Sequence, residues 1–180
     1  MTSVVVRGPD SVAVFDPDDG GRLVSFSVSG HELLVPHGAD MWHSGNFVIA
    51  PWTGRLRDAQ LQFGGASYAF SANNGPHALH GLVTDWPWKV TGEGELTAEL
   101  PPVWPWRGRV VQTTRLFEGG AEFGIELHAD EAMPAAVGWH PWFARRVGGA
   151  ELKLEVAPAH MWANDEAGLP TGELEEPAPH

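Results

Sequence analysis

The chain has 180 residues, of which 43% are hydrophobic and 19% charged, so it is long and apolar enough to fold around a hydrophobic core. Its 11 basic and 23 acidic residues give a net charge of −12, which argues against nucleic acid or an anionic membrane as a partner, because both are bound through clusters of Lys and Arg. The lack of cysteine excludes disulfides, thiol chemistry and cysteine-rich zinc sites.

No targeting or membrane segment is predicted. The start, MTSVVVRGPDSVAVF, has neither the basic region nor the apolar run of a signal peptide. No stretch reaches the ~20 apolar residues of a membrane helix. We therefore expect a cytoplasmic protein.

The first predicted element is a hairpin over Ser11–Gly30. SVAVFD forms its first strand, DPDDGG its turn and LVSFSVSG its second strand. Alternation in the second strand predicts that Val24, Phe26 and Val28 share one face and that three serines share the other.

Two further hairpins follow. In LQFGGASYAF, Gly64 and Gly65 supply the positive φ that a tight turn needs. In RVVQTTRLFEGGAEFGIELHA, two β-rich runs flank Glu118–Gly120.

The last part of the chain contains one more predicted strand. ELKLEVAP alternates, with Leu152, Leu154 and Val156 on one face, and residues 164–180 are predicted to be a surface loop or linker. No segment has helical periodicity, and no internal repeat is evident. Short strands separated by turns predict an all-β, antiparallel sandwich or barrel, with residues 1–180 forming one domain.

Four segments join polar, titratable and aromatic residues in stretches poor in strand signals: GNFVIAPWTGRLRD, NNGPHALHGL, DWPWK and GWHPWF. Loops carry function more often than strands. His77, His80 and His140 could ligate a metal, but the first two lie in a Gly/Pro loop, and no carboxylate suggests a fourth ligand. We therefore favour His80 and His140 as a pair of imidazoles that exchange protons with a sugar.

Other side chains could bind that sugar. Arg55 offers a planar fork of donors, and Trp52, Trp86 or Trp142 could stack on a pyranose. The alternatives are tryptophans that fill the core and histidines that are hydrogen-bonded loop residues. Arg57 is interpreted as a solvated surface charge.

These motifs resemble those of the aldose 1-epimerase (galactose mutarotase) family. The resemblance lies in the APW and GR residues before a hairpin with paired glycines, in the loop NNGPHALHG, in GWHPWF and in LPTGEL. These motifs occur in the family's order, from about residue 10 to residue 174.

The resemblance implies a galactose mutarotase-like (supersandwich) β-sandwich and an isomerase that interconverts the α and β anomers of a free aldose. In that family a base deprotonates the anomeric hydroxyl while an acid protonates the ring oxygen. His140 matches the acid, His80 the second active-site histidine and Arg55 the substrate-binding arginine. Trp52 and Trp142 are further candidates for sugar binding. No cofactor or metal is expected.

One family feature is not found. The glutamate base, and an aspartate that binds the sugar, follow the LPTGEL loop, whereas this sequence ends at His180. Glu173, Glu175 and Glu176 lie in a different motif and are not assigned as the base. We therefore expect a fragment or a shortened form of the family fold, and its activity is left open.

Three alternative functions are considered. A hexose 6-phosphate epimerase would need extra basic residues at the pocket rim, and it ranks lower because the candidates are only Arg55, Arg57, Lys89 and Arg145 or Arg146. A non-catalytic carbohydrate-binding domain would use the same arginine, histidines and tryptophans without a base. A tryptophan-rich structural domain would bind no ligand. The sequence leaves open which monosaccharide is bound and which oligomer forms.

Overall fold

The computed structural model describes residues 3–36, 38 and 41–177, which form two compact units. The first unit contains Met1–Thr53 and His80–Glu151, and the second contains Gly54–Leu79 and Leu152–His180. The described residues contain only two short 3-10 helices, η1 (Met41–His43) and η2 (Arg57–Ala59), and none of their helices is long and apolar enough to span a membrane. That residues 1–180 form one domain remains a prediction.

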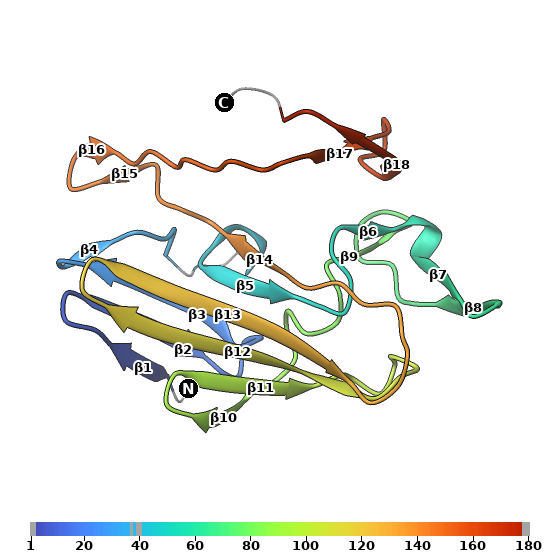
Figure 1. Ribbon diagram of the computed structural model, residues 1–180, viewed down its shortest axis with the longest axis horizontal. Coiled ribbons are helices and arrows are strands. Elements are labelled where there is room, and N and C mark those ends of the chain that lie inside the picture. The colour runs from blue at the N-terminus through green and yellow to red at the C-terminus, as the bar shows by residue number, and fades with distance from the viewer. Residues whose placement is uncertain (1–2, 37, 39–40, 178–180) are drawn as a thin grey trace. The chain divides into compact units, whose positions relative to one another are not determined.

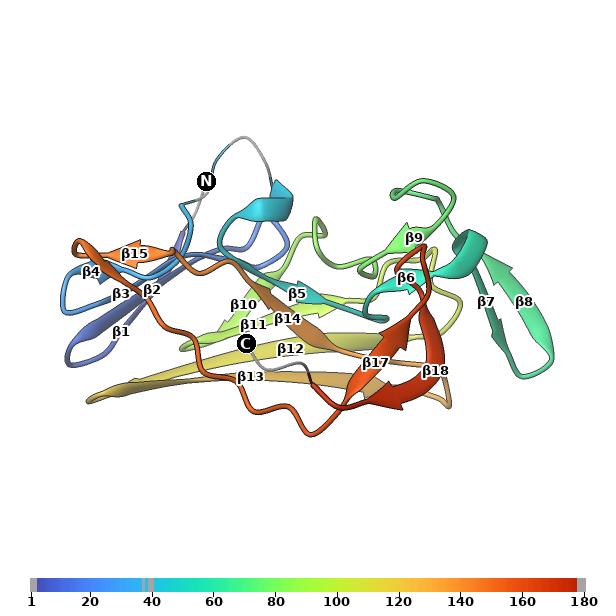
Figure 2. The same cartoon turned by 90° about the horizontal axis from the view of Figure 1, so that it is seen from above.

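The first unit is built from two antiparallel sheets that face each other (Figures 1 and 2). One sheet has the order β1-β2-β3-β5-β14, with β4 paired to β3. Its strands are β1 (Val4–Arg7), β2 (Ser11–Asp16), β3 (Arg22–Val28), β4 (His31–Glu32), β5 (Asn46–Ile49) and β14 (Gly138–Pro141). The other has the order β10-β11-β12-β13, with strands β10 (Lys89–Gly92), β11 (Glu95–Glu99), β12 (Gly108–Phe117) and β13 (Gly120–Ala129). A short ribbon of β15 (Arg146–Val147) and β16 (Ala150–Glu151) completes the unit.

Alternating side chains of both sheets form the core between them. Phe15 of β2, Leu96 of β11 and Val110 of β12 are all 0% exposed. Phe26 of β3 and Phe123 of β13 meet edge to face across the gap, with ring centroids 5.4 Å apart. Such aligned packing of two sheets defines a β-sandwich, so the predicted fold class is confirmed.

The first and third predicted hairpins are confirmed. β2 pairs with β3, and β12 pairs with β13 over ten residues each. One detail was wrong. A bulge pairs Phe15 with Leu23 and Val14 with Ser25, so Val24 has no partner and the alternation shifts. Leu23, which is 2% exposed, therefore faces the core in place of Val24.

The second unit consists of three short antiparallel pairs. They are β6 (Arg55–Leu56) with β9 (Ala78–Leu79), β7 (Gln60–Phe63) with β8 (Ala66–Ala69), and β17 (Met161–Asn164) with β18 (Pro170–Glu175). The β7–β8 pair is the second predicted hairpin. Its turn residues Gly64 and Gly65 have φ of 60° and 82°, as a two-residue type I′ turn requires.

Two predictions for the last part of the chain were wrong. ELKLEVAP is not a strand beyond Glu151, because residues 152–158 have no strand partner among the described residues. The supposed loop or linker instead contains β18, which pairs with β17. Asp165 closes their turn, because its Oδ1 accepts hydrogen bonds from the backbone N–H groups of Ala167 and Leu169. Residues 178–180 of that predicted loop lie outside the described residues.

Shortening a side chain of the core should lower the free energy of unfolding. Leu96→Ala is expected to lower the free energy of unfolding by about 2–5 kcal/mol, because a fully buried leucine leaves a cavity. Val103→Ala, at a side chain that is 56% exposed, should change it by less than about 0.5 kcal/mol. Urea unfolding followed by tryptophan fluorescence measures both, and equal losses would contradict the assigned core.

Candidate functional site

The pairing of β14 with β5 positions His140. In this antiparallel pair, Trp139 lies opposite Val48 and His140 lies opposite Phe47. Val48 and Trp139 belong to the hydrophobic core, so the next residue on each strand points to the other face of the sheet. His140 and Phe47 therefore lie on the face that the sandwich core does not use.

On that face, rings from three parts of the chain form what we call the imidazole cluster. Its members are Trp42, His43, Phe47, His80, His140 and Trp142. The ring of His140 stacks on Phe47 with centroids 4.7 Å apart and on Trp142 at 5.6 Å. The His80 ring meets the His140 ring edge to face at 5.1 Å. The two histidines predicted as a pair are thus neighbours.

His80 is held by an unusual backbone conformation. Its φ is +63°, a left-handed value that non-glycine residues seldom adopt and that often marks functional sites. The next residue, Gly81, forms a parallel bridge with Ala50. The hydroxyl of Thr84 donates to the His80 carbonyl oxygen at 3.1 Å. These contacts lock the loop against β5, so His80 keeps its place beside His140.

A buried arginine packs against the Phe47 ring of the cluster. The side chain of Arg22 is 0% exposed, and its guanidinium carbon lies 4.8 Å from the centre of the Phe47 ring. Its Nε donates to the carboxylate of Asp19 at 2.8 Å, and one terminal nitrogen donates to the Ser44 carbonyl oxygen at 3.2 Å. Buried charge is tolerated when it is paired in this way. Arg22 thereby fixes the ring on which His140 stacks.

Nε1 of Trp142, immediately after β14, is a buried polar atom of the cluster without a hydrogen-bond partner among the described residues. A buried polar atom that makes no hydrogen bond costs about 1–3 kcal/mol, and such atoms in a folded protein often mark a place where a ligand or water binds.

The protonation of His140 follows from its surroundings. Burial lowers the pKa of its imidazole below the ordinary value of 6.5, and the neighbouring His43 lowers it further, while a backbone hydrogen bond acts in the opposite direction. The ring is therefore mainly neutral at pH 7.

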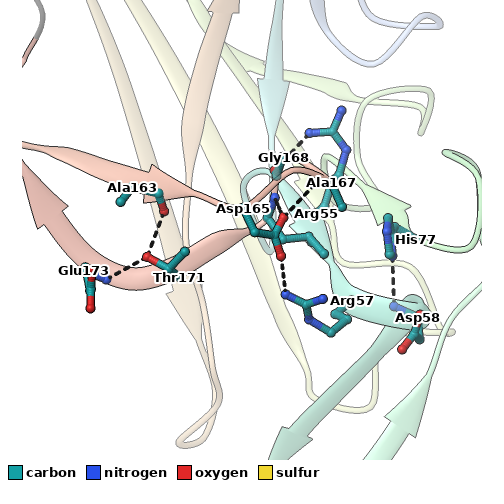
Figure 3. A network of polar contacts seen from close by, with 11 residues as sticks. Arg55, Arg57, Asp58, His77, Ala163, Asp165, Ala167, Gly168, Thr171 and Glu173 are labelled. Carbon is teal, nitrogen blue, oxygen red and sulfur yellow. Dashed lines mark hydrogen bonds and ion pairs between the residues drawn. The ribbon is translucent and has the colours of Figure 1, made fainter.

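Arg55 belongs to the second unit, where its guanidinium is held in place (Figure 3). Its Nε donates to Oδ1 of Asn74 at 2.8 Å, and a terminal nitrogen donates to the carbonyl oxygen of Gly168 at 3.3 Å. Backbone pairing of Arg55 with Leu79 fixes its position on β6. The bond to Gly168 ties the NNGPHALHG loop region to the turn between β17 and β18.

The other polar contacts of Figure 3 stiffen the same unit. Arg57, interpreted as a solvated charge, has a side chain that is 60% exposed but forms an ion pair with Asp165 at 2.8 Å. The hydrogen bond from Arg57 lowers the pKa of the Asp165 carboxyl, and backbone donors from Leu169 and Ala167 assist. His77 uses its Nδ1 to accept the backbone N–H of Asp58 at 3.0 Å.

Metal ligation is not supported by the residues described. No group of three or more His, Cys, Asp or Glu side chains among them could hold a metal ion. His77 also lies in the second unit, whereas His80 and His140 lie in the first.

The candidate tryptophans have different surroundings. Trp52 is only 6% exposed and packs against Trp104 with ring centroids 5.8 Å apart, which is the packing role that the sequence left open. Trp86 is partly buried against the hydrophobic core. Trp142 is partly exposed and stacks on His140, so it is the candidate that lies in the imidazole cluster.

Sequence reasoning did not identify Arg22, Phe47, Trp42 or His43. Phe47 does lie in the GNFVIAPWTGRLRD segment, but an apolar residue of a strand carries no chemical signal of its own. Arg22 follows a turn and resembles any surface charge until its burial is known.

Comparison with solved structures identifies the class of fold. The chain is similar to an aldose epimerase homologue from C. elegans, with 19% identity, a TM-score of 0.75, and coverage of 96% of this chain and 60% of that one. It is similar to a galactose mutarotase-like protein from Lactobacillus casei, with 17% identity, a TM-score of 0.75 and coverage of 97% and 64%. It is also similar to galactose 1-epimerase from Lactobacillus acidophilus, with 17% identity, a TM-score of 0.71, and coverage of 93% of this chain and 55% of that one. The fold is thus a galactose mutarotase-like β-sandwich, and the chain spans less than two thirds of the length of these structures.

The family follows from the sequence match. The family model for aldose 1-epimerase matches residues 3–179, so this chain belongs to the aldose 1-epimerase family. No curated protein matches it. The family resemblance noted in the sequence is confirmed.

Gly81 should be essential for the position of His80. A Cβ added there would lie 2.0 Å from the Ala50 carbonyl oxygen, and φ is +78°. Gly81→Ala should therefore lower the free energy of unfolding by more than Gly119→Ala, whose φ of +72° imposes only the backbone cost of about 1–2 kcal/mol because nothing lies within 4 Å. Urea unfolding compares the two variants, and a smaller loss for Gly81→Ala would refute the proposed locking contact.

The state of His140 should appear in the pH dependence of stability. Because its pKa is lowered in the folded state, the unfolded chain binds a proton near pH ~6.5 that the folded chain does not. His140 therefore makes the protein lose stability as the pH falls below ~6.5. The free energy of unfolding should fall less for His140→Gln than for the parent between about pH 7.5 and 5.5, and NMR should find the His140 pKa below that of a free histidine. Identical pH slopes, or a raised pKa, would contradict this assignment.

Proposed function

We propose that this chain binds a free aldose and supplies the acid of an aldose 1-epimerase reaction, which interconverts the α and β anomers. The observation that carries the proposal is the contact between the His80 and His140 rings, 5.1 Å apart, on the face of the sheet opposite the core. Membership of the aldose 1-epimerase family supports the same reaction type.

In the proposed reaction, the His140 imidazolium donates its proton to the ring oxygen of the sugar. The bond between C1 and the ring oxygen breaks as the anomeric hydroxyl loses its proton to solvent water, which acts as the base for residues 1–180, and C1 becomes a carbonyl carbon. Rotation about the C1–C2 bond presents the other face of the carbonyl, and the reverse steps close the ring. Protons balance over the cycle because each group regains its starting state.

The other residues are assigned binding roles. His80 hydrogen-bonds the sugar beside His140 and polarises it. The family resemblance assigns substrate binding to Arg55, and its guanidinium keeps free donors for this role, since arginine has five N–H donors and the bonds to Asn74 and Gly168 use two of them. Trp142 presents an aromatic surface next to His140, and its buried Nε1 is a donor for a sugar oxygen. Trp52 keeps its predicted assignment as a second aromatic contact for the sugar, with 6% of its surface exposed.

We assign the base to none of the carboxylates in residues 1–180. The family resemblance gives that role to a glutamate that follows the LPTGEL motif, and Glu173, Glu175 and Glu176 do not match it. Positioned proton transfer by one group contributes about 10²–10⁴-fold to a rate. The chain should therefore bind the sugar, and any acceleration of mutarotation should come from His140 as the acid.

Polarimetry on freshly dissolved α-galactose or α-glucose tests the role of His140. The chain should accelerate mutarotation in proportion to its concentration, and His140→Gln should remove most of this acceleration. The rate should rise as the pH is lowered toward the His140 pKa, because burial keeps the ring mainly neutral at pH 7.

The matched control is His128→Gln, since His128 lies on β13 and pairs with Glu126 outside the imidazole cluster. This variant should keep the parent rate. If sugar shifts the His80 and His140 NMR signals but the rate equals that of buffer, the protein is a carbohydrate-binding domain and the catalytic proposal is wrong. If sugar causes no shift at either ring, sugar binding by this cluster is refuted as well.

A further inference from the structure

Residues 152–158 run as an extended segment between β16 and β17 (Figure 1). Residues 153–158 have no strand partner, and none of their backbone groups is hydrogen-bonded to the backbone of another described residue. Leu154 and Val156 are 64% and 66% exposed. An extended chain with unpaired N–H and C=O groups is a template for a further strand.

The side chains of this segment alternate in character. Leu152, Leu154 and Val156 share one face, and Lys153 and Glu155 share the other. The segment therefore has an apolar face and a face with one charge of each sign. Exposed apolar side chains in alternation are typical of a strand whose partner covers them.

The sequence is complementary to itself when two copies run antiparallel. If Leu154 lies opposite Leu154 of the second copy, Leu152 lies opposite Val156 on the apolar face. On the other face, Lys153 lies opposite Glu155, and the symmetric pair forms a second time. Opposite charges at directly facing positions stabilise a strand pair.

Two neighbouring registers are disfavoured by charge. A pair centred on Lys153 sets lysine against lysine, and one centred on Glu155 sets glutamate against glutamate. A pair centred on Leu152 sets Lys153 against Glu151, but it leaves Glu155 opposite Gly149 and Leu154 opposite Ala150, so it pairs fewer charges and less apolar surface. A parallel pair in register repeats both repulsions. Pro158 ends the ladder, because proline has no N–H to donate. The antiparallel register centred on Leu154 is therefore selected.

From this complementarity we propose that residues 152–156 form the interface of a homodimer, in which two copies add this segment to each other as antiparallel strands about a two-fold axis. Main-chain hydrogen bonds supply the pairing and the Lys153–Glu155 contacts supply the register. The proposal concerns assembly and does not depend on sugar binding.

A charge swap tests the register. Sedimentation velocity of the full chain, from about 1 µM to 1 mM, should show a concentration-dependent dimer, as expected for a small interface. Lys153→Glu and Glu155→Lys each replace two attractions by repulsions and should weaken the dimer at least about tenfold. The double variant K153E/E155K restores opposite charges and should regain the parent affinity.

The control is Glu118→Lys, which changes the same charge in an exposed turn of the first unit and should leave the dimer intact. A parent protein that stays monomeric throughout the series overturns the proposal, whichever other partner covers the segment. A dimer that is unchanged in both single variants also overturns it, because that dimer uses another surface.

A cross-link tests the geometry directly. The chain has no cysteine, so Leu154→Cys introduces a single thiol. Facing residues of an antiparallel pair have Cα atoms about 4.5–5.5 Å apart, within the range that a disulfide spans. Mild oxidation should give a covalent dimer much faster for Leu154→Cys than for Val103→Cys, an exposed position in a turn. Equal rates for the two variants would refute pairing through Leu154.

Discussion

The antiparallel pairing of β14 with β5 is the contact on which the candidate site depends. Side chains alternate along a strand, so a register that turns Trp139 into the core must turn His140 away from it. A slip of one residue would exchange the two rings. Burial of Trp139 and Val48 makes such a slip unfavourable, and core packing thereby determines where the imidazole points. The same strand β5 holds Phe47, on which His140 stacks, and it leads into Ala50, which bridges to the loop of His80.

The imidazole cluster combines low solvent access with aromatic neighbours, and this combination controls protonation. A ring enclosed by Phe47 and Trp142 loses hydration, so its charged form is disfavoured and its pKa falls. The protonated form of such an imidazole becomes more favourable when a substrate or a carboxylate approaches it. The buried Arg22 is paired with Asp19 and packs against the Phe47 ring. It stabilises the position of Phe47 and acts on His140 only through that ring. Arg55 is fixed separately by Asn74 and Gly168 within the second unit.

The extended segment after β16 shows the opposite situation, in which a strand-like pattern has no partner among the described residues. Alternating apolar side chains stabilise a strand only when a neighbour supplies hydrogen bonds and a surface to cover. The strands β17 and β18 pair with each other but leave the facing pair Trp162 and Leu174 more than half exposed. Large apolar side chains of the second unit are therefore left exposed to solvent.

Local patterns in the sequence determined much of this protein. The turns at Gly64–Gly65 and Glu118–Gly120 follow from the conformational freedom of glycine, and strand alternation identified the hairpins and the all-β class. The motifs around His80 and His140 indicated the family. Tertiary structure alone decided that Leu23 replaces Val24 in the core, that Arg22 is buried beneath Phe47, and that residues 152–158 lack a strand partner among the described residues. The physical reason is range: a turn depends on a few adjacent residues, whereas burial, ring stacking and strand pairing depend on segments that only the folded chain brings together.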